Sequence, residues 1–205
     1  METTIKTTPI NTAIPADARI FVTDYASYNE GTQFEFGQWV NLAHFETAED
    51  LRQNILDHFS YCDTVRPLAC GTPREEIMIS DFEGFPGSLY DELYLSDSWC
   101  NFEILFEYFE RLISCGYDAK IAEAFIKTGI ASINDLDTFF EELTNCYQGE
   151  FDSDKDFTMD YAEQCGDYDF DKPQPWPLNN IDWNGATLEH MQYYTEESGH
   201  YFNAC

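Results

Sequence analysis

The stretch SINDLDTFFEELTNCYQGEFDSDKDFTMDYAEQCGDYDFD, residues 132–171, decides how the rest of the chain is interpreted. Its forty residues hold thirteen carboxylates and one cation, Lys155. Phe, Tyr and Leu recur between the acids at helical spacing, whereas disordered acidic tails lack both aromatic residues and periodicity. We therefore expect this stretch to fold and to hold its charges at fixed positions on a surface.

The whole chain is strongly acidic and rich in aromatic residues. It has 205 residues with 39 Asp and Glu against 10 Lys and Arg, a formal charge of -29, and aromatic residues make up 17%. The aromatic content is typical of globular proteins and argues against disorder. This charge destabilises the compact state by self-repulsion, so something other than folding favours the many acids. One explanation is solubility in a salt-rich cytoplasm. The other, which we adopt, is binding to a basic partner. The shortage of Lys and Arg argues against direct nucleic-acid binding.

The sequence holds no motif that identifies an enzyme or a cofactor site. The patterns GxxxxGK[ST], GxGxxG, GxSxG and HExxH do not occur, and paired carboxylates are too numerous to identify a general acid and base. No run reaches the roughly eighteen apolar residues of a membrane span, and the N-terminus lacks the apolar core of a signal peptide. We expect a cytoplasmic protein that is not an enzyme, without a cofactor or membrane contact.

The cysteines favour reduced thiols. Seven are present, an odd number, and none forms a CxxC pair of the kind found in metal knuckles. A bridge between Cys62 and Cys70 remains an open alternative. His58 is expected to have a structural role on a helix.

The first residues predict a flexible extension followed by two strands. Residues 1–17 are rich in Thr and Pro without an apolar period. Residues 19–24 have strand composition, residues 29–31 supply turn chemistry, and residues 34–41 alternate apolar and polar side chains.

A helix, a linker and a third strand are expected next. Thr47 is placed to cap a helix through Phe59, with one apolar face formed by Ala48, Leu51, Ile55 and Phe59. Residues 61–74 contain Pro and Gly and predict a linker, and residues 75–81 predict a strand before a tight turn at 82–87.

The second half of the chain is mainly helical in pattern. From Ser98 to Gly116 an apolar stripe predicts a helix, with the positions Trp99, Phe102, Leu105, Phe106, Phe109, Leu112 and Ile113. Further helices are expected after Asp118, after Ser132 with Asp135, and after Ser153 with Asp156. Their core positions include Ile133, Leu136, Phe140, Leu143, Phe157, Tyr161 and Cys165.

The last part of the chain predicts short, mixed elements. Residues 146–151 form a short extended segment, residues 181–191 a helix and residues 199–203 a closing strand. We predict an α+β protein that consists of three small consecutive modules without one continuous core, at about 18–72 (α+β), 73–129 (mainly helical) and 130–205 (acidic α+β).

One pattern points to a metal. Five carboxylates match positions 1, 3, 5, 9 and 12 of a calcium-binding EF-hand loop, namely Asp152, Asp154, Asp156, Asp160 and Glu163. Position 6 is Phe157 where the loop needs Gly, and the Ser153 capping pattern favours a helix instead. A calcium-binding acidic module is therefore a lesser alternative, and we assign no metal ligands.

Several blocks of the sequence resemble the ArdA antirestriction proteins. These blocks are ARIFVTDYASYNEG at 18–31, the following Gly37-Gln38-Trp39, EEIMISDFEGF at 75–85, GEFDSDKDF at 149–157, and IDW at 181–183 with a late GHYFN. Their order and spacing are also similar. The resemblance spans about residues 18–205 and is carried most specifically by the first two blocks.

The resemblance implies an elongated dimer that imitates bent B-form DNA. Proteins of this family occupy the DNA groove of type I restriction-modification enzymes, and they have no catalytic residues. The resemblance gives no residue roles, so the candidate partner-binding face is taken from the acidic clusters of this sequence: Glu103, Glu107, Glu110, Asp135, Asp137, Glu141, Glu142, Asp152, Asp154, Asp156, Asp160 and Glu163.

Carboxylates at i, i+4 and i+7 recur about every 5–6 Å along a helix, comparable to the phosphate repeat along one DNA strand. Trp99, Phe102 and Phe109 are surplus aromatic residues that suggest a dimer interface. The N-terminal extension, the linker at 61–74 and the Pro-rich segment at 173–177 depart from the family pattern. Inhibition of another basic DNA-binding protein would use the same electrostatics and remains an alternative.

Overall fold

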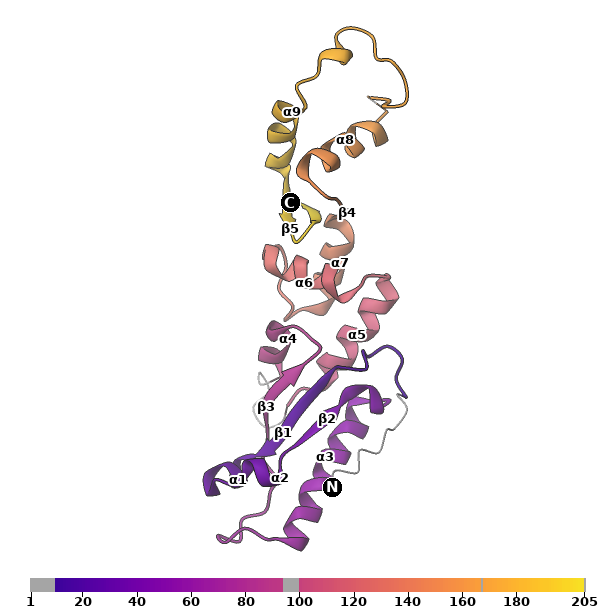
Figure 1. Cartoon of the computed structure of the whole chain (residues 1–205). Coiled ribbons are helices and arrows are strands. Elements are labelled where there is room, and N and C mark those ends of the chain that lie inside the picture. The colour runs from indigo at the N-terminus through magenta and orange to yellow at the C-terminus, as the bar shows by residue number, and fades with distance from the viewer. Residues whose placement is uncertain (1–9, 94–99, 167, 205) are drawn as a thin grey trace. The chain divides into compact units, whose positions relative to one another are not determined.

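The computed structural model describes residues 10–93, 100–166 and 168–204 (Figure 1). The chain divides into two compact units, one ending at Gly116 and the other beginning at Tyr117. Each unit combines helices with a three-stranded antiparallel sheet, so the predicted α+β class is confirmed. Within the described ranges, no helix has the length and apolar character needed to cross a membrane.

The first unit is built on a sheet whose central strand comes first in the chain. The strand β1 (Arg19–Asp24) lies between β2 (Gln38–Asn41) and β3 (Ile77–Glu83), and both pairings are antiparallel. Ile20 and Val22 are fully buried, so alternate side chains of β1 face the core. The strand predicted at 19–24 is confirmed, and the one predicted at 75–81 forms at slightly later residues.

Two short helices replace the turn and the first half of the second strand that we expected after β1. These are α1 (Tyr25–Glu30) and α2 (Gln33–Phe36). The Asp24 carboxylate accepts a hydrogen bond from the Ser27 amide at 2.7 Å and so caps α1, and Gly31 ends it with a φ of 73°. The helix α2 takes up the first half of the segment whose alternating apolar pattern predicted a strand, so this pattern alone does not fix the structure of so short a segment.

The segment before β1 is held against the end of β2. The amides of Ile10 and Asn11 both donate to the Ala43 carbonyl, in the 3₁₀ turn η1 (Leu42–His44), and Ile14 is buried. Residues 10–17 therefore pack on the unit, although we expected them in a flexible extension. The remainder of that extension, residues 1–9, lies outside the described residues.

The long helix of the first unit is α3 (Ala48–Val65). Its cap is Thr47, as predicted, which accepts a hydrogen bond from the Asp50 amide at 3.1 Å. The predicted core face is confirmed, because Leu51, Ile55 and Phe59 are fully buried. The helix runs beyond Phe59 into the expected linker, since no Pro or Gly stops it before Pro67.

Two further helices complete the first unit: α4 (Gly87–Glu92) and α5 (Glu103–Cys115). The predicted apolar stripe of α5 is buried at Phe102, Leu105, Phe106, Phe109 and Leu112, whereas Ile113 is exposed. Gly116 ends the helix in the left-handed conformation, with a φ of 75°. Ser98 and Trp99, which we expected to begin this helix, lie outside the described residues.

The second unit begins with two capped helices. The first, α6 (Ala119–Thr128), has the predicted Asp118 cap, and the second is α7 (Leu136–Cys146). The cap of α7 is Asp135, whose carboxylate accepts from the Thr138 amide at 3.2 Å. The prediction that Ser132 caps this helix is wrong, because Asp135 itself occupies the position before the first turn.

The sheet of the second unit contains β4 (Tyr147–Glu150), β6 (His200–Asn203) and β5 (Tyr194–Glu197), in that order. The predicted extended segment at 146–151 and the closing strand at 199–203 are confirmed, and β5 was not predicted. The core is rich in aromatic residues, with Phe125, Phe139, Phe157, Tyr201 and Phe202 buried.

The remaining elements of the second unit are α8 (Asp154–Gln164), the 3₁₀ turn η2 (Leu178–Asn180), α9 (Trp183–His190) and the 3₁₀ turn η3 (Met191–Tyr193). Ser153 caps α8 as predicted, accepting from the Asp156 amide at 3.2 Å. On the predicted apolar row only Phe157 is buried, because Tyr161 and Cys165 are exposed.

The finer division into three modules stays a prediction. Two observations bear on its boundaries. The strand β3 pairs with β1 across the expected boundary at 72/73, and α6 packs on β5 and β6 across the one at 129/130.

The described cysteines are free thiols, so the Cys62–Cys70 bridge left open by the sequence is not formed. Cys62 is buried and Cys70 is exposed. The Sγ of Cys62 lies 3.7 Å from the His58 ring, whose Nε2 contacts the Phe36 carbonyl at 2.7 Å. This contact between α3 and α2 agrees with a structural role for His58.

Candidate functional site

The first part of the candidate surface is a row of three glutamates on α5. Glu103, Glu107 and Glu110 are exposed at positions i, i+4 and i+7, on the face opposite to the buried stripe. Glu103 accepts from the Arg52 guanidinium at 3.0 Å, and Glu107 pairs with Arg111 at 2.7 Å. These pairs neutralise part of the row, because each brings a guanidinium of the protein itself onto the carboxylate.

The second part consists of four acids at α7. Asp137 and Glu141 are exposed one turn apart. Asp135 is engaged in the cap, where it also accepts from the Thr138 hydroxyl at 2.8 Å. Glu142 is half-buried, and its Oε2 lies 3.8 Å from the Cys146 thiol. Asp137 and Glu141 therefore present their charge outward, and Asp135 and Glu142 also serve local structure.

The third part is the run of acids at α8. Three of them, Asp156, Asp160 and Glu163, repeat the i, i+4, i+7 spacing of the α5 row. Asp156 takes part in the cap, where it accepts from the Ser153 hydroxyl at 2.6 Å, and Asp160 accepts from Gln164 at 2.6 Å. Of this row only Asp156 lies in the first turn, where an acid interacts favourably with the helix dipole.

The remaining two acids of this run lie at the start of α8. Asp152 is exposed before the cap. Asp154 accepts a hydrogen bond from the Tyr201 hydroxyl at 2.8 Å. Burial, together with the neighbouring Asp154 carboxylate, raises the pKa of Tyr201 well above its usual range. Asp154 thus ties the helix to β6 and is a structural residue as well as a charged one.

The geometry of α8 is incompatible with the calcium-loop alternative. An EF-hand loop turns sharply at a Gly in position 6, whereas here that position is Phe157, which is buried in the core of the second unit. The helix begins at Asp154, inside the supposed loop. Among the residues that the structure describes, no three His, Cys, Asp or Glu side chains are grouped to hold a metal ion.

The twelve predicted residues are divided between the two units. Glu103, Glu107 and Glu110 belong to the first unit, and the other nine belong to the second. The three acids of the first unit lie on α5, and those of the second unit lie on or just before α7 and α8.

Several of the Lys and Arg side chains form ion pairs with carboxylates of the same chain. Ion pairs of 4 Å or less join Arg19 to Glu83, Arg66 to Glu35, Lys127 to Glu197, and Lys172 to Asp169. Lys172 is the main cause that lowers the pKa of Asp169. These pairs occupy cations that could otherwise neutralise the helical acidic rows.

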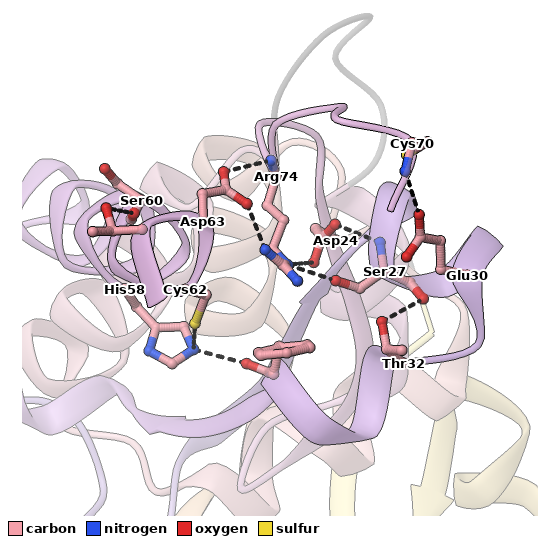
Figure 2. A network of polar contacts seen from close by, with 12 residues as sticks. Asp24, Ser27, Glu30, Thr32, His58, Ser60, Cys62, Asp63, Cys70 and Arg74 are labelled. Carbon is pink, nitrogen blue, oxygen red and sulfur yellow. Dashed lines mark hydrogen bonds and ion pairs between the residues drawn. The ribbon is translucent and has the colours of Figure 1, made fainter. Parts of the chain in front are cut away.

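The most elaborate charged group of the first unit was not predicted. Figure 2 shows Arg74 pointing between Asp24 and Asp63, with its Nε donating to the Ser27 hydroxyl at 2.9 Å. Its side chain is fully buried, and its guanidinium lies 4.2 Å over the Phe36 ring. The sequence placed Arg74 in a linker. The available signal was a lone Arg close to the start of a strand, in a chain with few cations.

This charged group joins three parts of the first unit. Asp24 ends β1, Asp63 lies near the end of α3, and the amide of Arg74 donates to Asp63 at 3.0 Å. Nearby, the Glu30 carboxylate accepts from the Cys70 amide at 3.1 Å, which contributes to lowering the pKa of Glu30. The segment after α3 is therefore held in place within the first unit, to which α5 also belongs.

The comparisons with known proteins identify one family. A family model described as "Antirestriction protein (ArdA)" matches residues 20–201. No curated protein and no solved structure matches the chain. The matched range includes all three acidic helices and all but the first residue of β1 and the last two residues of β6 in the two sheets.

Proposed function

The chain belongs to the ArdA family of antirestriction proteins, and on this basis we propose that it inhibits type I restriction-modification enzymes by occupying their DNA-binding groove. In this proposal the protein is a DNA mimic that acts stoichiometrically in the cytoplasm, where these enzymes meet incoming DNA. It works as a homodimer and carries out no catalysis.

The observation that carries the proposal is the repeated acidic row. Glu103, Glu107 and Glu110 on α5 have the same spacing as Asp156, Asp160 and Glu163 on α8. Side chains at this spacing lie about 5–6 Å apart on a rigid helix. The α8 row therefore offers regularly placed negative charges, and the α5 row offers them in part, because Arg52 and Arg111 pair with Glu103 and Glu107. A groove lined by Lys and Arg would receive such rows as it receives phosphates.

The total charge is of the right magnitude for this role. Duplex DNA carries one negative charge per roughly 1.7 Å of axis, so a net charge of -29 corresponds to about 50 Å of duplex. Because the attraction acts between surface charges, we expect fast association that weakens as salt rises.

The dimer rests on family membership. The aromatic residues that first suggested an interface do not support it, because Phe102 and Phe109 are buried in the first unit and Trp99 lies outside the described residues. The dimer is tested directly by light scattering, and a monomeric mass would remove it.

A competition assay tests the function. A type I methyltransferase core bound to labelled cognate DNA is titrated with the protein at two salt concentrations. We expect displacement near one dimer per enzyme, and weaker displacement at the higher salt. No displacement at any ratio would contradict the proposal and would point to another basic protein as the partner.

A pair of charge-matched variants tests the α8 row. In the first, Asp156→Asn, Asp160→Asn and Glu163→Gln remove three charges from the row. In the control, three other exposed acids of the second unit are neutralised: Glu123→Gln, Asp171→Asn and Glu189→Gln. Both variants have the same net charge, so only a specific role of the row makes the first bind more weakly than the control.

A further inference from the structure

The sheet of the first unit and the helix α2 carry a cluster of aromatic side chains that is separate from the acidic rows. Phe21 of β1 is its centre, with its ring 5.6 Å from that of Trp39 and 6.3 Å from that of Phe34. The Phe34 side chain is 78% exposed and Trp39 is 38% exposed. We call these three residues the aromatic face.

The backbone is shaped to hold this cluster. A Cβ at Gly37 would lie 2.7 Å from the Phe21 ring and 2.5 Å from the Gln33 carbonyl oxygen, closer than atoms pack in proteins. Gly37 therefore lets the chain pass close to Phe21, and Trp39 meets the same ring edge-on. The residues Gly37-Gln38-Trp39 have no part in the acidic rows. They instead bring the Trp39 ring against Phe21 and so form part of the aromatic face.

The border of the aromatic face is charged. The Arg19 guanidinium lies 4.5 Å over the Trp39 ring, and it is ion-paired to Glu83 at 2.6 Å. Asp81 is exposed and lies opposite Phe21 across the sheet. Since Glu83 neutralises Arg19, the border is acidic on the β3 side.

The charge distribution selects the kind of partner. Two copies of a chain with a net charge of -29 would repel each other if their Asp81 carboxylates met at this face. Nucleic acid would be repelled for the same reason. A protein surface with an apolar centre and flanking Lys or Arg side chains complements both the rings and the carboxylates. Aromatic clusters of this kind dominate the affinity of protein interfaces.

We propose that the aromatic face docks on an apolar patch bordered by Lys or Arg side chains on the restriction enzyme that the protein inhibits. This inference rests on the proposed function and adds a contact that DNA does not make. The two contacts differ in their response to salt, because burial of rings is not screened whereas attraction between surface charges is.

The test compares Phe34→Ser with Tyr61→Ser. Phe34 is the most exposed ring of the aromatic face, and Tyr61 is an exposed ring on α3, 66% accessible, outside the cluster. Binding of each full-length variant to the type I methyltransferase core is measured at roughly 0.05 M and 0.3 M salt. We expect Phe34→Ser to weaken binding about tenfold at both salts, and Tyr61→Ser to match the wild type. Thermal unfolding confirms that both variants fold.

Each outcome decides the inference. Wild-type affinity of Phe34→Ser, while the α8 row variant binds weakly, would overturn the aromatic contact and leave the proposed function intact. Failure of the wild type to bind the core would overturn both. Dissociation of the dimer by Phe34→Ser in sedimentation would show that the face joins two copies, which also overturns the inference.

Discussion

Arg74 and Asp63 form a buried ion pair that fastens the segment after α3 to that helix. The guanidinium is fully buried, and the Asp63 side chain is 27% exposed. A charge in this position is stable only while its partners are present.

We therefore expect Arg74→Met to destabilise the first unit strongly. Removing the guanidinium leaves Asp24 fully buried without its cation, and such a loss costs about 3–5 kcal/mol. The control is Arg66→Met, which removes an exposed pair with Glu35 and is expected to cost less than about 1 kcal/mol. Urea unfolding measures both. Equal losses in the two variants would contradict a special role for Arg74.

The cap of α7 gives a second prediction. Asp135→Ala removes the carboxylate that accepts from the Thr138 amide, so the free energy of unfolding of the second unit should fall by about 1 kcal/mol. Ser132→Ala, at the exposed position that the sequence suggested as the cap, should change it by less than about 0.5 kcal/mol. Chemical unfolding of the two variants distinguishes the two candidate caps. A larger loss of stability in Ser132→Ala would show that Ser132, and not Asp135, caps α7.

His190 makes the second unit sensitive to mild acid. Its ring lies against Phe157, Tyr161 and Tyr194, with centroids 5.0, 4.6 and 4.7 Å away. Burial lowers its pKa below the usual value. His190 therefore binds a proton more readily in the unfolded chain than in the folded protein. The free energy of unfolding falls as the pH drops from about 6.5 through the lowered pKa of the folded state.

The variant His190→Phe keeps an aromatic ring and removes the titration. We expect the wild type to lose more stability than this variant between about pH 7 and pH 5. The carboxylates titrate in both proteins, so the difference between the two curves reports His190 alone. Parallel curves of unfolding free energy against pH would contradict the prediction.

The thiols should differ in reactivity. Burial raises the pKa of Cys100 to about 11, so little reactive thiolate forms near neutral pH. Cys70, Cys115 and Cys165 are exposed. With iodoacetamide at about pH 8, mass spectrometry should find these three modified well before Cys100, and denaturation should abolish the difference. Early modification of Cys100 in the native protein would show that its site opens.

Local signals were sufficient for much of the fold. Thr47, Asp118 and Ser153 cap helices where the sequence placed them, because a cap depends on residues only three positions apart. Short helices and strands were harder to predict from the sequence. The helix α2 occupies residues that alternate like a strand, and β5 is a polar segment stabilised by its pairing with β6.

The acidic rows could be found from spacing alone, but their partners could not. Glu103, Glu107 and Glu110 follow helical periodicity, whereas the guanidinium that pairs with Glu103 comes from Arg52 in another helix. Arg74 was missed for the same reason, since Asp24 and Asp63 approach it only after folding. Contacts between residues distant in the chain leave no periodic signal.

The position of β1 has a consequence for the growing chain. Its neighbours in the sheet are both made later, β2 soon after it and β3 only after α3. During synthesis one edge of β1 stays open until β3 leaves the ribosome. An open edge is a template for pairing with other chains, so the nascent protein is exposed to aggregation during this interval.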